Sequence, residues 1–372
     1  MDVVPREVET AVVGAGLMGS ATAWALARRG RSAALFEQYP IGHRNGSSHG
    51  SARIVRRAYA DPLHVRLTGR AMELWREAEE RSGRALLRMT GGLDHGRSGA
   101  EEIAAVLERE DVPHELLDPA EAERRWPGMR FEGRVLFHPE AGTVDADAAV
   151  AAFTGLARAG GCSVHPETPV RRIEADGDRV RLETAAGTVR ARRVVAAAGA
   201  WTSELLGGLV ALPALTVTQQ QVFHFPRRGL AAGAPTVVHH TADPVVYSLP
   251  GGRDGGPGDG RKIAEYRDPL SPPVTPATRT GRVDPRARDR VAGYVRRWLP
   301  GLDPEPFNEA TCLYTSTADE EFVLDRSGPV VVCSPCSGHG AKFAPLIGES
   351  AADLAAGGRP LTPRFALDAP RG

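Results

Sequence analysis

The sequence predicts an α/β fold in two domains or in one large interleaved unit. Its 372 residues, 42% hydrophobic and 25% charged, are sufficient for that size of globular protein. An apolar run at 8–13 is followed by a glycine-rich turn, a helical pattern and a second apolar run. A later apolar run at 193–201 ends in small residues, as a strand returning to the same sheet would. Strands that alternate with helices are typical of a parallel sheet.

The glycine-rich turn carries the fingerprint of a dinucleotide site. Gly14, Gly16 and Gly19 have the spacing G-x-G-x-x-G between the first strand and the first helix. The first glycine allows the tight turn, the second lets the backbone approach a pyrophosphate, and the third allows close helix–strand packing. Glu37 ends the second apolar run, where a carboxylate can accept hydrogen bonds from a ribose diol. The pattern predicts a Rossmann-like site for NAD or FAD.

Two later segments favour FAD. A nicotinamide-dependent dehydrogenase usually continues with further strand–helix units. Here residues 42–59 form a stretch dense in Gly, Ser and Arg with no strand period, so we predict a loop. The run at 193–201 resembles the second FAD contact of two-domain flavoprotein oxidases. A NAD-dependent dehydrogenase remains the alternative supported by the glycine turn and Glu37 alone.

Composition excludes several other classes. The formal net charge is zero, so the sequence has no electrostatic footprint for nucleic acid or an acidic membrane surface. No stretch approaches the roughly 18 apolar residues of a membrane span. The amino terminus is polar, without the apolar core of a signal peptide. We therefore expect a cytoplasmic protein with no nucleic-acid or membrane partner.

The cysteines and paired histidines do not predict a metal site. Cys333 and Cys336 form a C-x-x-C after a run of valines, but no second cysteine pair exists to complete a zinc site. The valine run is typical of a buried strand. His239 and His240 also lack a spaced partner, although one or both can still point into a pocket.

Lysine is rare in this chain, which makes each lysine a candidate functional residue. Lys262 and Lys342 are the only two lysines among 46 basic residues. Lysine offers a compact ammonium with a tunable pKa, whereas the arginine guanidinium is a permanently charged fork. Both lysines lie in glycine-rich surroundings that suit close approach of the backbone to a ligand.

Six segments follow one another in the order of a known family pattern. They are GAGLMG with Glu37, GSSHGSARIVRRAY at 46–59, ERRWPG at 123–128, RVVAAAGAW at 193–201, TCLYTSTADEEFVLD at 311–325 and SGHGAKFAPLIGE at 337–349. Together they resemble the monomeric sarcosine oxidase family, which includes N-methyltryptophan oxidase and pipecolate oxidase. The resemblance extends from Val8 to about Leu361.

The resemblance implies an FAD domain of the glutathione-reductase type and a substrate domain whose mostly antiparallel sheet covers the flavin. We expect the FAD domain at 1–85, 145–210 and 320–372, and the substrate domain at 86–144 and 211–319. It also implies FAD bound covalently through its 8α-methyl group to Cys312. Nearby cations would depress the pKa of that thiol and favour the thiolate. We expect the protein to be a monomer.

The family pattern also assigns roles to individual residues. Arg56 and Lys342 would hold the substrate carboxylate, through forked hydrogen bonds and a point charge respectively. Lys262 would lie over the flavin and stabilise the negative charge that forms on dioxygen. The expected catalytic residues are Lys262, Arg53, His339 and Tyr314, and the expected substrate-binding residues are Arg56, Lys342, Tyr59 and Tyr247. The expected cofactor-binding residues are Gly14, Gly16, Leu17, Met18, Gly19, Glu37, Ser47, Ser48, Arg53, Val170, Gly199, Trp201, Cys312, Gly338, Gly340 and Lys342.

The sequence departs from the family pattern at several positions. The segment between Tyr247 and Lys262 is longer and rich in Gly and Asp, so we expect a mobile lid or insertion there. Tyr266 stands where the family often has a histidine, and Pro335 stands where relatives have a small residue. These departures bear on the substrate rather than on the cofactor, so sarcosine itself is not assumed.

The combined prediction is an FAD-dependent oxidase of a small secondary or cyclic amine or amino acid. The C–N bond would be oxidised to an imine while dioxygen is reduced to hydrogen peroxide. No strong side-chain base is evident, which fits a substrate that arrives as the neutral amine. The alternatives are a flavin-dependent amino-acid dehydrogenase and a biosynthetic imine-forming oxidase with a substrate other than sarcosine.

Three further elements are predicted from local patterns. Residues 62–83 repeat apolar side chains at helical spacing, and residues 146–159 form a second helical pattern. Residues 214–225 have strand character and are expected to line a pocket.

Overall fold

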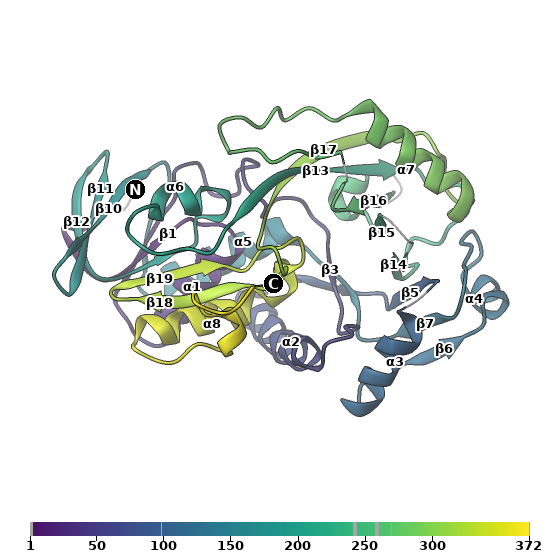
Figure 1. Ribbon diagram of the computed structural model, residues 1–372, viewed down its shortest axis with the longest axis horizontal. Coiled ribbons are helices and arrows are strands. Elements are labelled where there is room, and N and C mark those ends of the chain that lie inside the picture. Colours follow the sequence, from purple (N-terminus) through teal and green to yellow (C-terminus); the bar gives the residue numbers. More distant parts are fainter. Residues whose placement is uncertain (1–2, 98, 241–243, 257–259, 269, 372) are drawn as a thin grey trace.

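The computed structural model describes residues 3–97, 99–240, 244–256, 260–268 and 270–371. Within these residues the strands form two eight-stranded sheets and one three-stranded sheet, and helices pack against them. Figure 1 shows the first large sheet at the left and the second at the right, where helix α7 (Pro285–Trp298) covers it. The mixed α/β architecture confirms the predicted fold class.

The first sheet is built around β1 (Glu7–Val13). This strand pairs in parallel with β2 (Ala33–Phe36) and with β12 (Gly187–Ala196), and β12 pairs in parallel with β19 (Val330–Ser334). The other strands are β9 (Ser163–His165), β10 (Val170–Asp176), β11 (Arg179–Thr184) and β18 (Val323–Ser327). Segments from the beginning, middle and end of the chain therefore meet in one sheet. The exact domain boundaries proposed from the sequence stay a prediction.

Helices cover the first sheet on the side that is lower in Figure 1. Helix α1 (Leu17–Arg28) packs against α5 (Ala146–Ala159) and α8 (Ala344–Ala355). The contact between α1 and α8 is very close, because a Cβ on Gly348 would lie 2.5 Å from the backbone carbon of Ala21. Helix α2 (Pro62–Ser82) lies against α5 and α8.

The second sheet is mostly antiparallel, as the resemblance implied. Its order is β17, β13, β16, β15, β14, β5, β7 and β6, and only the β14–β5 pair among the described strands is parallel. The strands are β5 (Gly92–Gly96), β6 (Glu115–Leu117), β7 (Val135–His138), β13 (Thr216–Phe225), β14 (Thr236–His240), β15 (Val245–Pro250), β16 (Arg261–Tyr266) and β17 (Asn308–Ser316). The remaining α-helices of the described residues are α3 (Ala100–Arg109), α4 (Pro119–Arg125) and α6 (Thr202–Leu206).

Side chains alternate along the strands of the second sheet, so that one face of the sheet packs against α7 and the other lines a cavity. Apolar side chains such as Phe223, Val237 and Ile263 point toward α7 and form a core with it. The residues adjacent to them point the opposite way and line a cavity, because successive side chains on a strand face opposite sides. The cavity-lining residues of the sheet are Val222 and His224 on β13, Val238 and His240 on β14, Val245, Tyr247 and Leu249 on β15, Lys262 and Tyr266 on β16, and Asn308, Ala310, Cys312 and Tyr314 on β17, together with Glu309 at the start of β17.

The three-stranded sheet corrects one prediction. Residues 42–59 were expected to form a loop without strand structure, but β3 (Arg53–Val55) lies within them. It pairs with β8 (Gly142–Val144), which also pairs with β4 (Leu87–Met89). A strand of three residues is too short to show a period in the sequence, and its partner lies almost 90 residues away.

The other local predictions are confirmed. The helix predicted at 62–83 is α2, which begins after Asp61, whose side chain accepts a hydrogen bond from the backbone N–H of Leu63 at 2.9 Å. It ends at Gly83, which has a φ of 63°. The helix at 146–159 and the strand at 214–225 are α5 and β13. No helix among the described residues combines the length and apolar character that crossing a bilayer requires.

Candidate active site

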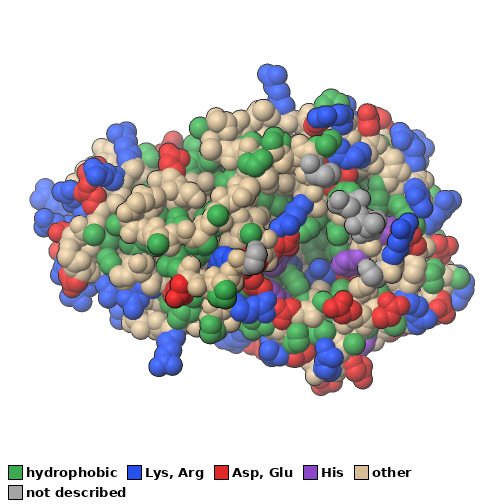
Figure 2. All heavy atoms as spheres, viewed as in Figure 1, with side chains coloured by type: hydrophobic (Ala, Val, Ile, Leu, Met, Phe, Trp, Pro, Cys, Tyr) green, Lys and Arg blue, Asp and Glu red, His purple; other side chains and the backbone are tan. Residues whose placement is uncertain are grey.

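One large cavity is lined by residues of both large sheets. Its volume is about 940 Å³, at the upper end of the range typical of ligand sites. Figure 2 shows a hollow to the right of centre in which histidine and basic side chains are visible. Every predicted site residue except Gly19 lines the cavity, so the structure brings the predicted residues together. Their individual roles stay predictions.

The glycine turn between β1 and α1 leaves no room for side chains. Gly14 has a φ of +99°, and a Cβ there would lie 2.5 Å from the carbonyl oxygen of Ala197. A Cβ on Gly16 would lie 2.9 Å from Ser48 Oγ, and one on Gly19 would lie 1.8 Å from the carbonyl oxygen of Gly14. Gly19 is thus a packing glycine that lies outside the cavity, as the third glycine of the fingerprint should be.

Glu37 is a buried carboxylate at the end of β2. Its Oε2 accepts a hydrogen bond from the backbone N–H of Ala15 at 2.7 Å, and its Oε1 accepts one from that of Tyr39 at 3.0 Å. Burial would raise the pKa of Glu37, but the contact with His43 and these two N–H groups outweigh it and lower the pKa. Glu37 is therefore ionised at neutral pH, next to the glycine turn.

Lys262 forms a first cationic group, on β16. Its Nζ donates a hydrogen bond to the carbonyl oxygen of Ala52 at 3.1 Å, and the residue is 5% exposed. Burial and the neighbouring charge of Arg53 lower the pKa of Lys262 to about 7, against the opposing influence of Cys312 and Asp254. At neutral pH the ammonium and the neutral amine are both populated.

Lys342 forms a second cationic group, on the 3-10 turn η3 (Gly340–Phe343). Its Nζ donates to Tyr59 Oη at 2.9 Å and to the carbonyl oxygen of His339 at 2.7 Å. Trp75 Nε1 on α2 donates to the carbonyl oxygen of Lys342 at 2.8 Å and fixes the turn. Burial, with a smaller contribution from Arg56, places the pKa of Lys342 well below its ordinary value.

Arg56 and Tyr59 complete this second group. The Arg56 guanidinium lies over the Tyr59 ring, 5.0 Å from its centroid. Tyr59 Oη lies 3.2 Å from His339 Nδ1, and His339 Nε2 lies 3.3 Å from the carbonyl oxygen of Glu320. Because that carbonyl only accepts, Nε2 carries the hydrogen and Nδ1 accepts from Tyr59. The cavity therefore contains an arginine and a lysine whose free N–H groups can bind an anion such as a carboxylate.

A family model described as FAD dependent oxidoreductase (DAO) matches residues 9–354. The chain belongs to the FAD-dependent oxidoreductase family. It is 36% identical to the monomeric sarcosine oxidase of Streptomyces avermitilis, over 92% of this chain and 92% of that protein. It is 31% identical to the human peroxisomal sarcosine oxidase, over 96% and 93% of the two chains. The resemblance seen in the sequence is thus confirmed, and a nicotinamide-dependent enzyme is no longer an alternative.

Solved structures support the same family. The structure of NikD, described as an unusual amino acid oxidase essential for nikkomycin biosynthesis, has a TM-score of 0.87 and 28% identity, over 98% of both chains. The glycine oxidase of Geobacillus kaustophilus has a TM-score of 0.81 at 22% identity, over 99% of this chain and 100% of that chain. At that identity the second likeness shows the fold alone.

The residues of this FAD-dependent oxidoreductase fit the cofactor that its family name implies. Only glycine fits at Gly14 and Gly16, because a Cβ would clash with Ala197 or Ser48, so the turn keeps the tight form of a pyrophosphate-binding turn. Glu37 adds a carboxylate next to that turn, as expected for a ribose contact. A Cβ on Gly340 would lie 1.7 Å from the carbonyl oxygen of Pro335, so η3 also comes close to the preceding loop. The other residues predicted to bind the cofactor surround the same cavity.

Cys312 requires a correction. It lies on β17, 8% exposed, with Arg53 and Lys262 close enough to influence it. We expected these cations to depress the pKa of the thiol. Burial instead raises the pKa of Cys312, and the two cations offset only part of that rise. The sequence showed the nearby charges but could not show how completely the sulfur is removed from water.

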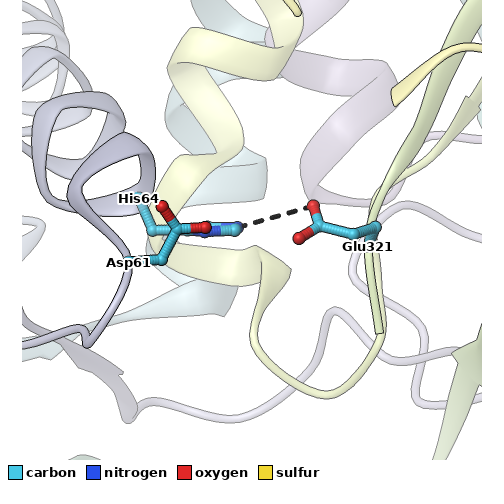
Figure 3. A group of neighbouring side chains, drawn as sticks. All are labelled: Asp61, His64 and Glu321. Carbon is cyan, nitrogen blue, oxygen red and sulfur yellow. Dashed lines mark hydrogen bonds and ion pairs between the residues drawn. The ribbon is translucent and has the colours of Figure 1, made fainter. Parts of the chain in front are cut away.

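Figure 3 shows a polar group of Asp61, His64 and Glu321 that also lines the cavity, next to the second cationic group, since the His64 ring stacks on Tyr59 with centroids 5.2 Å apart. Asp61 Oδ2 lies 3.2 Å from His64 Nδ1, and Glu321 Oε2 lies 3.9 Å from His64 Nε2. These three residues could in principle hold a metal ion. The Arg364 guanidinium, however, forms ion pairs with both carboxylates, and a fixed positive charge there repels a second cation. We interpret the group as an ion-pair network that ties α2 to the segment before β18.

Sequence reasoning identified Glu37 and allowed for His240 in a pocket, but it missed Asp94, Asp254, His49 and His224. Asp94, 1% exposed on β5, accepts hydrogen bonds from Arg56 Nη1 at 2.6 Å and from His240 Nε2 at 2.9 Å. The signal that could have revealed it is an aspartate inside an otherwise buried strand. His240 lines the cavity, while its neighbour His239 points into the core, where it lies 3.0 Å from a Glu132 oxygen. His49, His224 and Asp254 also line the cavity near Lys262.

Proposed function

We propose that the protein is an FAD-dependent oxidase of a small secondary or cyclic amine that carries a carboxylate, such as an N-methyl or cyclic amino acid. The observation that carries this proposal is the separation of two cationic groups within one cavity. Arg56 and Lys342 form one group, and Lys262 forms the other on a different strand. The relatives named above are sarcosine and amino acid oxidases, which favours the same reaction class.

In this proposal each group has a distinct role. Arg56 and Lys342 bind the substrate carboxylate and fix the carbon next to the nitrogen in the cavity. Bound FAD would supply the two-electron acceptor for oxidation of the C–N bond to an imine. The Lys262 ammonium stabilises the negative charge that develops on dioxygen as it is reduced to hydrogen peroxide.

We further propose that FAD is attached covalently at Cys312. Joining the thiol sulfur to the 8α-methyl carbon as a thioether releases two electrons and two protons, which dioxygen accepts to form hydrogen peroxide. The side chain of Cys312 lines the cavity on the same strand as Tyr314, which supports this proposal. The monomeric state stays a prediction. Cytoplasmic location stays a prediction.

The test is a peroxide-coupled screen of N-methyl and cyclic amino acids with purified yellow protein. We expect peroxide from at least one carboxylate-bearing amine and none from the matching amine that lacks the carboxylate. Protein purified without visible flavin absorbance would contradict the proposed cofactor. Yellow protein that produces no peroxide with any member of the screen would contradict the proposed oxidase.

The lowered pKa of Lys262 favours one second candidate, a flavin-dependent dehydrogenase. A neutral amine cannot stabilise an anion as an ammonium does, so a Lys262 held neutral would leave reoxidation by dioxygen slow. Flavin that bleaches with substrate and recolours slowly in air would support this candidate. Rapid recolouring would support the oxidase.

A further inference from the structure

The glycine-rich segment between β15 and β16 carries a carboxylate to the Lys262 site. Asp254, on the 3-10 turn η2 (Gly252–Gly255), accepts a hydrogen bond from the backbone N–H of Ser51 at 2.6 Å. Ser51 Oγ in turn accepts the backbone N–H of Asp254 at 3.0 Å. Ala52, the next residue, offers the carbonyl oxygen that accepts from Lys262 Nζ at 3.1 Å. The Asp254 carboxylate is therefore connected to the Lys262 ammonium through hydrogen bonds to the Ser51–Ala52 backbone.

The described part of this segment is held at two points. Arg253 forms an ion pair with Asp145 and lies 3.8 Å from Asp147 Oδ2, at the amino-terminal end of α5. Asp147 Oδ1 accepts the backbone N–H of Gly50 at 2.8 Å, so the same carboxylate also fixes the residue before Ser51. We expected a mobile lid or an insertion here. Residues 251–256 are attached to the segment that receives Lys262, and residues 257–259 lie outside the described chain, so the expected lid or insertion stays a prediction.

We propose that Asp254 is a positioning residue for Lys262: it fixes the Ser51–Ala52 backbone that accepts the ammonium and places a negative charge beside it. This inference rests on the proposed function, because it assigns to Asp254 control over the side chain that we expect to meet dioxygen. Asp254 was not among the residues predicted from the family pattern, so the inference adds a residue to the proposed site.

The charges around Lys262 support the inference. Burial first and Arg53 second lower the pKa of Lys262 to about 7, whereas Asp254 and Asp147 act in the opposite direction. Burial also lowers the pKa of His49 to about 3 and that of His224 to about 4, so neither ring adds positive charge near neutral pH. The two aspartates thus oppose the loss of the lysine charge.

The scarcity of lysine makes the test direct. Holoenzyme labelled with 13C-lysine contains two lysine side chains, and the Cε shift of each reports its protonation as pH is varied. The Lys262→Met variant assigns the two signals. Asp254→Asn keeps an oxygen that can accept the Ser51 N–H but removes the charge. We expect it to move the Lys262 titration down by about one pH unit and to leave the Lys342 titration in place. Asp254→Glu keeps the negative charge, so its Lys262 titration should lie close to that of the wild type.

A kinetic readout accompanies the titration. In Asp254→Asn the pH profile of flavin reoxidation by dioxygen should move down by the same amount as the Lys262 titration. Asp176→Asn, which removes an exposed aspartate at the edge of the first sheet, is the matched charge control and should change neither profile. If Asp254→Asn does not fold, Ser51→Ala removes the Oγ bond to the Asp254 N–H and should shift Lys262 in the same direction.

An unchanged Lys262 titration in Asp254→Asn would overturn the inference. Its failure can be told apart from failure of the proposed function. A Lys262→Met variant that reoxidises at the wild-type rate would contradict the oxygen role of Lys262, whereas the lysine titration would still report whether Asp254 acts on that side chain.

Discussion

Arg56 and Asp94 form a buried ion pair at the wall of the cavity, with Arg56 Nη1 donating to Asp94 Oδ1 at 2.6 Å. Burial would raise the pKa of Asp94, but the charge of Arg56 and the contacts with His138 and His240 lower it far below its ordinary value. Asp94 is therefore a permanent carboxylate at neutral pH. Because it takes up only one end of the guanidinium, it can orient Arg56 while the remaining N–H groups meet a substrate.

Because Asp94 orients Arg56, we expect its replacement to weaken binding of the substrate carboxylate. Asp94→Asn should raise KM for a carboxylate-bearing amine by about tenfold, the result of losing roughly 1.4 kcal/mol, and should change kcat much less. Steady-state kinetics on the best substrate of the screen measure the split. Asp118→Asn, at an exposed ion pair with Arg134, is the control and should leave both constants unchanged. Equal losses in kcat and kcat/KM would assign Asp94 a different role.

The same aspartate predicts an acid dependence of stability. Its folded pKa is depressed, so its contribution is complete above the ordinary carboxyl pKa of about 4 and is lost as pH falls below that value. Removing one partner of a buried pair costs about 3 kcal/mol. Urea denaturation should show Asp94→Asn less stable than the wild type by about that amount near neutral pH. The difference should narrow in acid, and a difference that stays constant below about pH 4 would contradict the assignment.

Replacing Lys262 separates the two half-reactions. Lys262→Met should slow flavin reoxidation by dioxygen by about a hundredfold, since it removes the charge that stabilises the developing anion. Reduction of the flavin by substrate should change little. Stopped-flow absorbance measures each step separately. Lys342→Met is the paired variant, and it should instead weaken substrate binding, because Lys342 belongs to the group with Arg56 and Tyr59.

Replacing Cys312 tests the covalent attachment. Acid-precipitated wild-type protein should retain its yellow colour, whereas Cys312→Ser should release it into the supernatant. Cys333→Ser is the matched control, because Cys333 is also a buried thiol and should leave the colour with the polypeptide. Colour released from the wild type would show that the flavin is not attached.

Close backbone packing predicts opposite effects for two helical glycines. Gly19→Ala would place a Cβ 1.8 Å from the carbonyl oxygen of Gly14, so we expect a loss of about 3 kcal/mol and protein without flavin. A Cβ on Gly155, inside α5, would have no neighbouring atom within 4 Å, and Gly155→Ala should stabilise the protein by about 0.5–1 kcal/mol. Thermal unfolding and flavin absorbance distinguish the two. Flavin retained in Gly19→Ala would contradict the packing role.

The fold was largely predictable because its signals are local or belong to ordered motifs. The glycine turn, α2 and α5 each have a pattern within one short stretch. The membership of the cavity was also predictable, since the family pattern pointed to residues that the sheets bring together. What the sequence could not show is how neighbouring residues act on one another. Asp94 and Arg56 are separated by 38 residues, and Asp254 and Ser51 by 203, so only the folded chain shows these pairs.

The depressed pKa expected for Cys312 failed for the same physical reason. A count of nearby cations can be made from aligned motifs, but the extent of desolvation depends on every residue that covers the sulfur. The pKa of Lys262 illustrates the same limit, because burial is its largest determinant and the charged neighbours come second.

The attachment of the glycine-rich segment through Arg253 and Asp254 has an evolutionary consequence. Asp254 holds the Ser51–Ala52 backbone that accepts the Lys262 ammonium, and Arg253 ties the same segment to Asp145. Arg56, which follows β3, and Lys342, on η3, lie on other segments. Under the proposed roles, a change in that connection would alter the rate of reoxidation by dioxygen and would leave the contacts of the substrate carboxylate unchanged. Reactivity with dioxygen and specificity for the amine substrate would then be able to evolve independently in the same fold.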